Sequence, residues 1–254
     1  MKVQILGASG GIGGPARTTS LLVDDDILID AGTGVGDLSL AAMERVDHIF
    51  LTHSHLDHVA CLPFMMDSVG AARGKPVTVH SQEATLNGLR THLFNGVLWP
   101  DFARLPTVEA PFMTYQTVVP GAEYTVGVRR VRAIPVTHIV PAVGYLVRGP
   151  KGSIAFSGDT TTTEEFWRVV NSCEDVKHVI IEASFLDQDE PLARISKHMC
   201  PKLLAEDLKK LKPGPQVHIT HLMPGAEEEI MAEIARHVPN NTPRRLVRGD
   251  VLEC

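Results

Sequence analysis

The sequence predicts a layered α/β domain, and three features of the 254-residue chain indicate this fold class. Short runs rich in Val, Ile and Leu alternate with stretches whose apolar residues recur at helical spacing. Hairpins are frequent between these alternating elements. The composition, 44% hydrophobic and 21% charged, suits a globular protein with a sizeable core, and we expect one domain over residues 1–254.

The first half of the chain predicts a hairpin followed by alternating helices and strands. The hairpin turns at the acidic run Asp24–Asp26. Strands are expected at Leu21–Val23, Ile27–Ile29, His48–Thr52 and Val77–His80. Helices are expected at Leu38–Met43, Val59–Val69 and Glu83–Phe94.

The next segment, Asn95–Phe112, is rich in Pro and aromatic residues and shows neither helical nor strand periodicity. We expect this segment to form either a lid over a pocket or a homodimer contact, because exposed aromatic patches often serve association. The β-rich runs that follow are Thr114–Val119, Arg130–Val136, Val143–Val147, Ile154–Phe156, Val179–Glu182 and Val217–Thr220. Helices are expected at Glu164–Asn171, Lys202–Leu211 and Glu227–His237.

The net charge of −6 argues against a nucleic-acid partner, because such proteins usually carry a basic face. A small anionic substrate is compatible with this charge, since metal ions supply positive charge locally. The four cysteines lie far apart without a Cys-x-x-Cys pair, which indicates reduced thiols and a cytoplasmic location. Met1–Leu6 lacks the length and basic leader of a signal peptide. No apolar stretch approaches the roughly 20 residues that cross a bilayer, so no membrane association is expected.

One segment carries most of the chemical information. His53, His55, Asp57 and His58 fall within six residues directly after a predicted buried strand. Residues two apart in an extended loop point the same way, so His53 and His55 face one side. Asp57 and His58, at the start of a helix, converge from the other side. A metal ion needs three or four such ligands, so this loop and a few distant partners would hold two ions.

Three other predicted strands end in a metal-binding side chain. Ala133–Thr137 is followed by His138, Ile154–Gly158 by Asp159, and Val217–Thr220 by His221. If these strands share an edge with His48–Thr52, every ligand reaches the same rim. The predicted set then divides into two sites that Asp159 bridges: His53, His55 and His138 hold one ion, and Asp57, His58 and His221 hold the other. Zn²⁺ is the expected metal, with Mn²⁺ or Fe²⁺ as alternatives.

The loop Thr52–His58, together with Leu28–Gly32, Ser157–Thr160 and Ile219–His221, resembles the metallo-β-lactamase superfamily along the whole chain. The resemblance implies an αββα sandwich, in which helices flank two mixed β-sheets and a dinuclear site lies between the sheets. It matches the seven ligands above position by position. It also implies that Asp30 orients a ligand histidine.

Within the superfamily, the sequence is most similar to the class II 3′,5′-cyclic-nucleotide phosphodiesterases. His53–Leu62 resembles their signature, although that pattern prefers Gly or Ser where Cys61 stands. His92–Asn95, Trp99–Asp101, Ser196–His198 and Ile219–Pro224 also look like theirs. The resemblance implies a small anionic substrate, a cyclic nucleotide such as cAMP or cGMP, and makes Asn95 and Trp99 substrate-contact candidates.

Two further residues are candidates for catalysis. His198 sits in a polar loop before a helix, and the resemblance favours contact with the scissile phosphate and protonation of the leaving oxygen. The alternative for His198 is a surface histidine that caps the following helix. Asp57 is expected to orient the attacking hydroxide as well as to bind metal. Glu182, at the end of a strand, either supports a ligand or is structural.

The expected reaction follows from the metal pair. Two ions lower the pKa of a bridging water, and the resulting hydroxide would attack phosphorus opposite the 3′-oxygen to give a 5′-nucleotide. A tRNA 3′-processing endonuclease shares most of these motifs, but the expected inserted arm is missing from the sequence. Lactone or thioester hydrolysis stays open. A non-catalytic binding protein that kept the fold is the alternative from another class.

The run Gly7–Gly13 resembles the phosphate loop of short-chain dehydrogenases, but the sequence around it does not fit that function. Such a loop works only where it opens a helix, whereas Gly14-Pro15 and the strand-like Thr18–Val23 follow here. We therefore expect the loop to let the backbone pass close to the metal rim.

Overall fold

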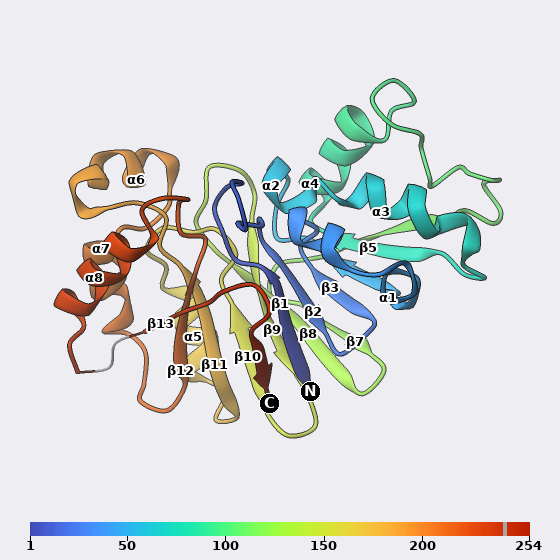
Figure 1. Ribbon diagram of the computed structural model, residues 1–254. Coiled ribbons are helices and arrows are strands. Elements are labelled where there is room, and N and C mark those ends of the chain that lie inside the picture. Colours follow the sequence, from blue (N-terminus) through green and yellow to red (C-terminus); the bar gives the residue numbers. More distant parts are fainter. Residues whose placement is uncertain (241–242) are drawn as a thin grey trace.

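Two mixed β-sheets of seven strands each pack face to face and carry helices on their outer sides (Figure 1). The computed structural model describes residues 1–240 and 243–254. The α/β fold class, an αββα sandwich, is therefore confirmed. The two ends of the chain lie together, since β1 pairs with β14 and the Met1 amino group donates to the carbonyl of Cys254.

The first sheet combines an antiparallel half with a parallel half. β14, β1, β2 and β3 pair antiparallel, and β3 to β6 pair parallel. Its strands, in spatial order, are β14 (Val251–Glu253), β1 (Lys2–Gly7), β2 (Ser20–Val23), β3 (Ile27–Ile29), β4 (His48–Phe50), β5 (Val77–Ser81) and β6 (Met113–Thr117).

The second sheet repeats this plan. β7 to β10 pair antiparallel, and β10 to β13 pair parallel. Its strands, in spatial order, are β13 (Arg244–Arg245), β12 (Gln216–Thr220), β11 (Val176–Glu182), β10 (Ser153–Phe156), β9 (Val143–Arg148), β8 (Arg129–Pro135) and β7 (Glu123–Val126).

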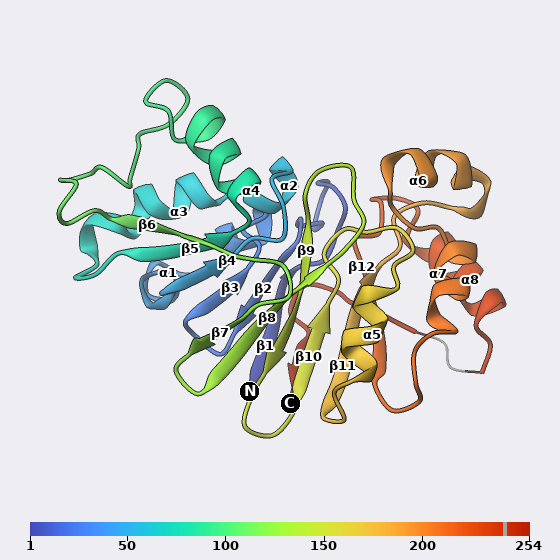
Figure 2. The same cartoon turned by 180° about the vertical axis from the view of Figure 1, so that it is seen from behind.

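The helices divide between the two outer faces, and Figure 2 shows α5 lying over the second sheet. The first face carries α1 (Leu40–Arg45), α2 (Leu56–Val59), α3 (Leu62–Val69) and α4 (Glu83–Gly88), and α4 continues as a π-helical turn over Leu89–Leu93. The second face carries α5 (Glu165–Asn171), α6 (Glu190–Ser196), α7 (Pro201–Leu208) and α8 (Glu227–His237). Among the described residues, no helix has the length and apolar character to cross a membrane.

Three apolar cores follow from the alternation of side chains along the strands. In β3, Ile27 and Ile29 face the core between the sheets, whereas Leu28 faces the helices of the first sheet. In β11, Ile180 faces the core between the sheets, whereas Val179 and Ile181 face α5, α7 and α8. Because both faces of each sheet are covered, the central strands are almost continuously apolar.

The structure differs from the sequence expectations mainly at element boundaries. The helix expected over Val59–Val69 begins at Leu62 instead. Val59 is the last residue of α2, the chain turns at Ala60 and Cys61, and Pro63 lies in the first turn of α3. The helix expected over Glu83–Phe94 leaves α-helical geometry at Leu89. Several elements were not predicted from the sequence: the strands β1, β7, β13 and β14, and the helix α6.

Candidate metal centre

Strand direction brings the predicted ligands to one edge of the second sheet. β10, β11 and β12 are parallel, and β8 runs the same way as β10 because both pair antiparallel with β9. The chain leaves β8, β10 and β12 at this edge and then presents His138, Asp159 and His221. In the first sheet, the loop after β4 and the short helix α2 present the other four, His53, His55, Asp57 and His58.

The structure gathers these seven side chains into two overlapping groups. One contains His53, His55, His138 and Asp159, and the other contains Asp57, His58, His221 and again Asp159. Within each group, the potential ligand atoms all lie within 4.8 Å of one another. This division is the one expected from the sequence; that these side chains bind metal stays a prediction.

Asp159 is placed to serve both groups through one oxygen. Its Oδ2 lies 3.6 Å from His53 Nε2 in the first group, and 3.3 Å from both His58 Nε2 and His221 Nε2 in the second. A carboxylate within reach of both groups is the geometry of a bridging ligand.

The imidazole nitrogens of the cluster are better placed to bind cations than to form hydrogen bonds with one another. The Nε2 atom of the fully buried His53 has no hydrogen-bond partner. The Nε2 atoms of His58 and His221 face each other at 3.3 Å. A buried polar atom without a partner is costly, and a metal ion would satisfy all three nitrogens. The His/Asp cluster is therefore compatible with two divalent metal ions.

In four of the clustered histidines, the ring nitrogen Nδ1 contacts a polar group outside the cluster. Asp30 Oδ2 accepts from His58 Nδ1 at 2.7 Å, and Thr52 Oγ1 lies 2.9 Å from His53 Nδ1. The carbonyl of Lys197 lies 3.2 Å from His138 Nδ1, and Ser184 Oγ lies 3.0 Å from His221 Nδ1. Such partners fix the tautomer and the ring orientation, and they leave Nε2 for an ion.

The charges of the cluster also suit a cation. Burial lowers the pKa of His53 well below its ordinary value, so the ring stays neutral and keeps a lone pair. Burial alone would raise the pKa of Asp159, but His221 and His58 hold it well below its ordinary value. The Asp159 carboxylate is therefore ionised. Although burial opposes it, this carboxylate also raises the pKa of His58 and of His221, so an ion that binds these two rings would displace protons from them.

Two residues of the site adopt a backbone conformation that L-amino acids rarely use. Asp30 has a φ of 58° and His221 a φ of 61°, both in the left-handed region. Each is anchored: the Asp30 amide donates to the carbonyl of Phe50 at 2.9 Å, and the His221 amide donates to that of Ala8 at 2.8 Å. Strain of this kind persists where the surroundings over-determine the conformation, and it is frequent at functional sites.

The glycine-rich loop after β1 packs against this strained histidine. A Cβ on Gly10 would lie 2.8 Å from the carbonyl oxygen of His221 and 2.9 Å from its Nδ1. The next regular element after the loop is β2, not a helix. The expectation that the loop brings the backbone close to the metal rim is confirmed.

Glu182 and His198 form a pair beside the cluster. Glu182 is the last residue of β11 and is fully buried, and its Oε1 lies 2.7 Å from His198 Nδ1. Although burial lowers the pKa of His198, the Glu182 carboxylate raises it to about 9. His198 also lines the cavity described next, so its ring lies between Glu182 and that cavity.

A cavity of about 530 Å³ opens directly onto the second group of ligands. Its polar lining includes His55, Asp57, Asp159, His198 and His221. Its apolar lining includes Ile12, Leu56, Phe185 and Met223. Among its lining residues there is no lysine or arginine.

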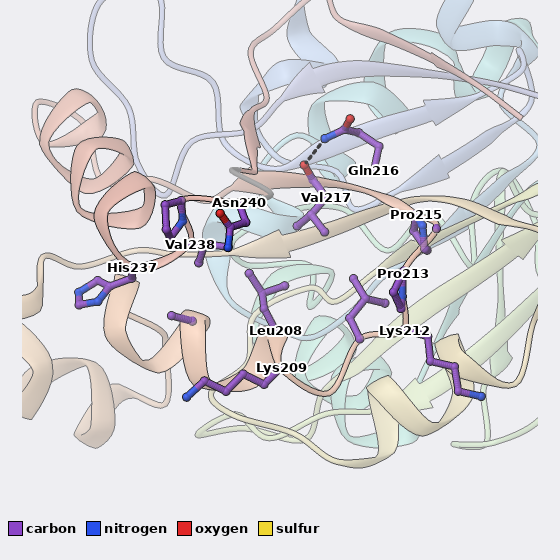
Figure 3. A pocket seen from close by; sticks show the side chains of 14 residues that line it. Leu208, Lys209, Lys212, Pro213, Pro215, Gln216, Val217, His237, Val238 and Asn240 are labelled. Atoms are coloured by element: carbon purple, nitrogen blue, oxygen red, sulfur yellow. Dashed lines mark hydrogen bonds between the residues drawn. The ribbon is translucent and has the colours of Figure 1, made fainter.

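Another cavity, of about 700 Å³, lies at the opposite end of β12 (Figure 3). Leu208, Val217 and several prolines line it, and His237 beside it already contacts Asp187 at 2.6 Å. Although this cavity is larger, none of the clusters of potential metal ligands lies in it.

The structure does not bring Asn95 and Trp99 into the cavity at the metal centre. The side-chain oxygen Oδ1 of Asn95 accepts from the amides of Val97 and Leu98 and so closes a turn. Trp99 packs edge-on against Phe64, with ring centroids 5.2 Å apart. The contacts of Asn95 therefore lie within the segment 95–112, whereas Trp99 packs this segment against α3. A lid or dimer function of the segment stays a prediction.

Sequence reasoning missed Ser184, Thr52 and the Lys197 carbonyl as partners of the clustered histidines. Ser and Thr are common throughout the chain, and a carbonyl carries no residue-type signal. Only Thr52 offered a clue, because it immediately precedes His53 at the end of a strand.

The sequence family described as the Beta-lactamase superfamily domain matches residues 25–245. A curated relative, a ribonuclease Z of Bradyrhizobium diazoefficiens, is 27% identical over 94% of this chain and 95% of its own length. A probable 3′,5′-cyclic-nucleotide phosphodiesterase of Yersinia pestis is 25% identical over 89% of this chain and 79% of its own length.

Among solved structures, unliganded yeast PDE1 superposes with a TM-score of 0.82 at 19% identity, covering 99% of this chain and 98% of that one. At that identity the likeness shows the fold alone. Because one relative is named a ribonuclease and another a cyclic-nucleotide phosphodiesterase, the similarities leave the substrate open. They do not support the expected exclusion of nucleic acid.

Proposed function

The chain belongs to the β-lactamase superfamily and is a metal-dependent hydrolase, and on that premise we propose that it hydrolyses 3′,5′-cyclic nucleotides to 5′-nucleotides. The relatives named as cyclic-nucleotide phosphodiesterases support this reading, including one from Schizosaccharomyces pombe that is 24% identical over 65% of this chain.

The observation that carries the proposal is the cavity beside Asp57, Asp159 and His221. Its volume, about 530 Å³, falls within the range of small-ligand sites. Ile12, Leu56 and Met223 offer an apolar wall to a nucleobase, while the metal cluster lies at the phosphate end. The lining of this cavity has no lysine or arginine to contact a polynucleotide backbone. Arg17, Arg245 and Arg248 line a separate cavity on the glycine-rich loop.

Zn²⁺ is the proposed metal, with Mn²⁺ and Fe²⁺ as alternatives, because imidazole and carboxylate donors accept all three. The residues that would hold it are the seven clustered side chains, His53, His55, Asp57, His58, His138, Asp159 and His221. The cysteines are free thiols, which agrees with a reducing compartment such as the cytoplasm.

Two bound ions would activate a water molecule for attack on phosphorus and neutralise charge on the phosphate. Asp57 lines the cavity and would accept a hydrogen bond from that water, which aligns it opposite the 3′-oxygen. His198, held at Nδ1 by Glu182, would donate a proton from Nε2 to the departing 3′-oxygen. The water oxygen would release a proton to solvent as it bonds to phosphorus. The bond to the 3′-oxygen would break as that oxygen takes the proton of His198, and a 5′-monophosphate with a free 3′-hydroxyl would result.

The second candidate is processing of tRNA 3′ ends, which the ribonuclease Z relatives favour. Hydrolysis of a lactone or thioester, or a non-catalytic binding role, would use the same scaffold. The net charge of −6 still argues against the tRNA reading, although the relatives keep it open.

A substrate panel tests the proposal. The purified protein, loaded in turn with Zn²⁺, Mn²⁺ or Fe²⁺, is incubated with cyclic AMP, cyclic GMP, bis(p-nitrophenyl) phosphate and a tRNA precursor. We expect 5′-nucleotides from one or both cyclic nucleotides, loss of turnover in D159N, and retained turnover in the surface control D25N. Cleavage of the tRNA precursor without turnover of cyclic nucleotides would replace the proposal by its alternative.

A further inference from the structure

Ser184 lies at the junction between the Glu182–His198 pair and the ligand His221. It follows β11 by two residues and is buried. Its Oγ donates to Glu182 Oε2 at 2.8 Å, lies 3.0 Å from His221 Nδ1, and lies 3.3 Å from His198 Nδ1.

The single hydroxyl proton of Ser184 decides how these contacts are shared. An ionised carboxylate only accepts, so the proton of Ser184 goes to Glu182. The Nδ1 proton of His198 goes to the same carboxylate, whose Oε1 is nearer to it, at 2.7 Å, than Ser184 is. Ser184 Oγ is therefore left as an acceptor toward His221. Nδ1 of His221 must carry a proton in order to donate to it.

We propose that Ser184 is a positioning residue, which holds His221 in the tautomer protonated on Nδ1 and so reserves Nε2 for a metal ion. Nε2 of His221 faces the second group of ligands: Asp57 Oδ2 lies 3.1 Å away, and Asp159 Oδ2 lies 3.3 Å away. The inference rests on the metal pair of the proposed function, but not on the identity of the substrate.

Without the hydroxyl, the opposite tautomer gains the advantage. His221 Nδ1 would lose the hydrogen bond that it makes with Ser184, while a proton on Nε2 would donate to Asp57 or Asp159. An entering ion would then have to displace that proton and break its hydrogen bond. Outer partners of this kind typically change metal affinity by about 10- to 100-fold.

The Ser184 hydroxyl also links the buried Glu182 carboxylate to a second imidazole ring. Glu182 contacts His198 directly and reaches His221 through Ser184. The amides of Thr160 and Met199 complete its four hydrogen bonds, at 2.9 and 3.2 Å. Glu182 is thus anchored firmly enough to orient both rings.

The test measures metal binding on the full chain loaded with two Zn²⁺ ions and titrated with a competing chelator. In S184A, we expect one ion to bind about 10- to 100-fold more weakly and the other to bind as in the wild type. S184T keeps the hydroxyl and should restore the affinity. Although burial opposes it, Asp159 and Asp57 raise the pKa of His221, so long-range ¹H–¹⁵N spectra of the imidazoles are recorded at a pH at which the metal-free ring is neutral. They read the tautomer directly, and in neutral S184A the proton of His221 should move from Nδ1 to Nε2.

S153A is the matched control. Ser153 is also buried and also donates to a carboxylate at 2.8 Å, that of Asp175, but it begins β10 at the end away from the metal centre. S153A should bind both ions normally. Wild-type affinity for both ions in S184A would overturn the inference, as would a loss in S184A and S184T alike with an unchanged tautomer. A wild-type protein that binds no metal would instead refute the proposed function.

Discussion

The carboxylate of Asp30 lies 2.7 Å from Nδ1 of His58, and both side chains are fully buried. The same carboxylate accepts from the amide of Thr52 at 2.8 Å. Asp30 thus joins the end of β3 to the ligand loop after β4. His58 belongs to the second group of potential ligands, and Asp30 does not. Asp30 is therefore placed to orient the His58 ring without binding an ion itself.

Replacing Asp30 by Ala should weaken binding of the ion held by Asp57, His58 and His221 by about 10- to 100-fold, because the ring of His58 loses its anchor. It should also lower the free energy of unfolding by about 3 to 5 kcal/mol, since a buried pair loses one partner. Metal titration and urea unfolding measure the two effects. Asp25, exposed in the β2–β3 turn, provides the control D25A, which should change neither.

Replacing His198 by Ala should reduce kcat by about 100- to 10,000-fold and leave two ions bound, because His198 belongs to neither of the two groups that share Asp159. It forms a third group of potential ligands only with Glu182 and His221, and we expect it to donate a proton there. Steady-state kinetics and metal analysis of the same preparation check this. H237A, which removes a histidine whose partner is Asp187 at the surface, should keep full activity. Lost metal in H198A would make His198 a ligand.

Replacing Gly10 by Ala should displace His221, because the new Cβ would lie 2.8 Å from its backbone oxygen. We expect weaker metal binding and a loss of about 1 to 3 kcal/mol in stability. A Cβ on Gly74 would meet nothing within 4 Å, so G74A should behave as the wild type in both thermal unfolding and metal titration. Unchanged metal affinity in G10A would show that the loop tolerates the shift.

Two pairs of histidines, one in each sheet, should make stability fall with acid. His48 Nδ1 lies 3.0 Å from His80 Nε2, and His178 Nδ1 lies 3.1 Å from His218 Nε2. Burial lowers the pKa of His80 and of His218 to about 4. Below the ordinary value near 6.5 the unfolded chain therefore binds protons that the folded chain refuses.

This stability is fully present above about pH 6.5 and is lost as the pH falls toward 4, by at most about 1.4 kcal/mol per pH unit for each histidine. Urea unfolding of the metal-free protein between those values measures the slope. H80Q and H218Q should each flatten it. A slope that stays the same in both buried variants would contradict the prediction.

The apolar wall of the cavity should contribute to substrate binding. Ile12 is 71% exposed and lines the cavity, so I12E would place a negative charge beside an anionic substrate. KM for the cyclic nucleotide should rise several-fold with little change in kcat, because binding is weakened equally in the ground and transition states. V128E changes an equally exposed valine in the β7–β8 turn and should leave KM unaltered.

Much of the site was accessible from residue types and spacing. Metal-binding side chains come directly after predicted strands, and parallel strands end at the same edge, so His138, Asp159 and His221 were predicted to converge. The prediction that Asn95 and Trp99 contact the substrate failed for a physical reason. These residues lie in a segment without the hydrophobic periodicity of a helix or a strand, and no local rule indicates where such a segment packs.

The sequence by itself determined the α/β class, the position of most strands along the chain, and the seven side chains that cluster. Side-chain chemistry and periodicity are local properties, so they can be recognised without the fold. Only the tertiary structure decided the contacts of Ser184, Gly10 and the carbonyl of Lys197, and which cavity adjoins the cluster. These depend on distances between strands that are far apart in the chain, which are set when the two sheets pack against each other.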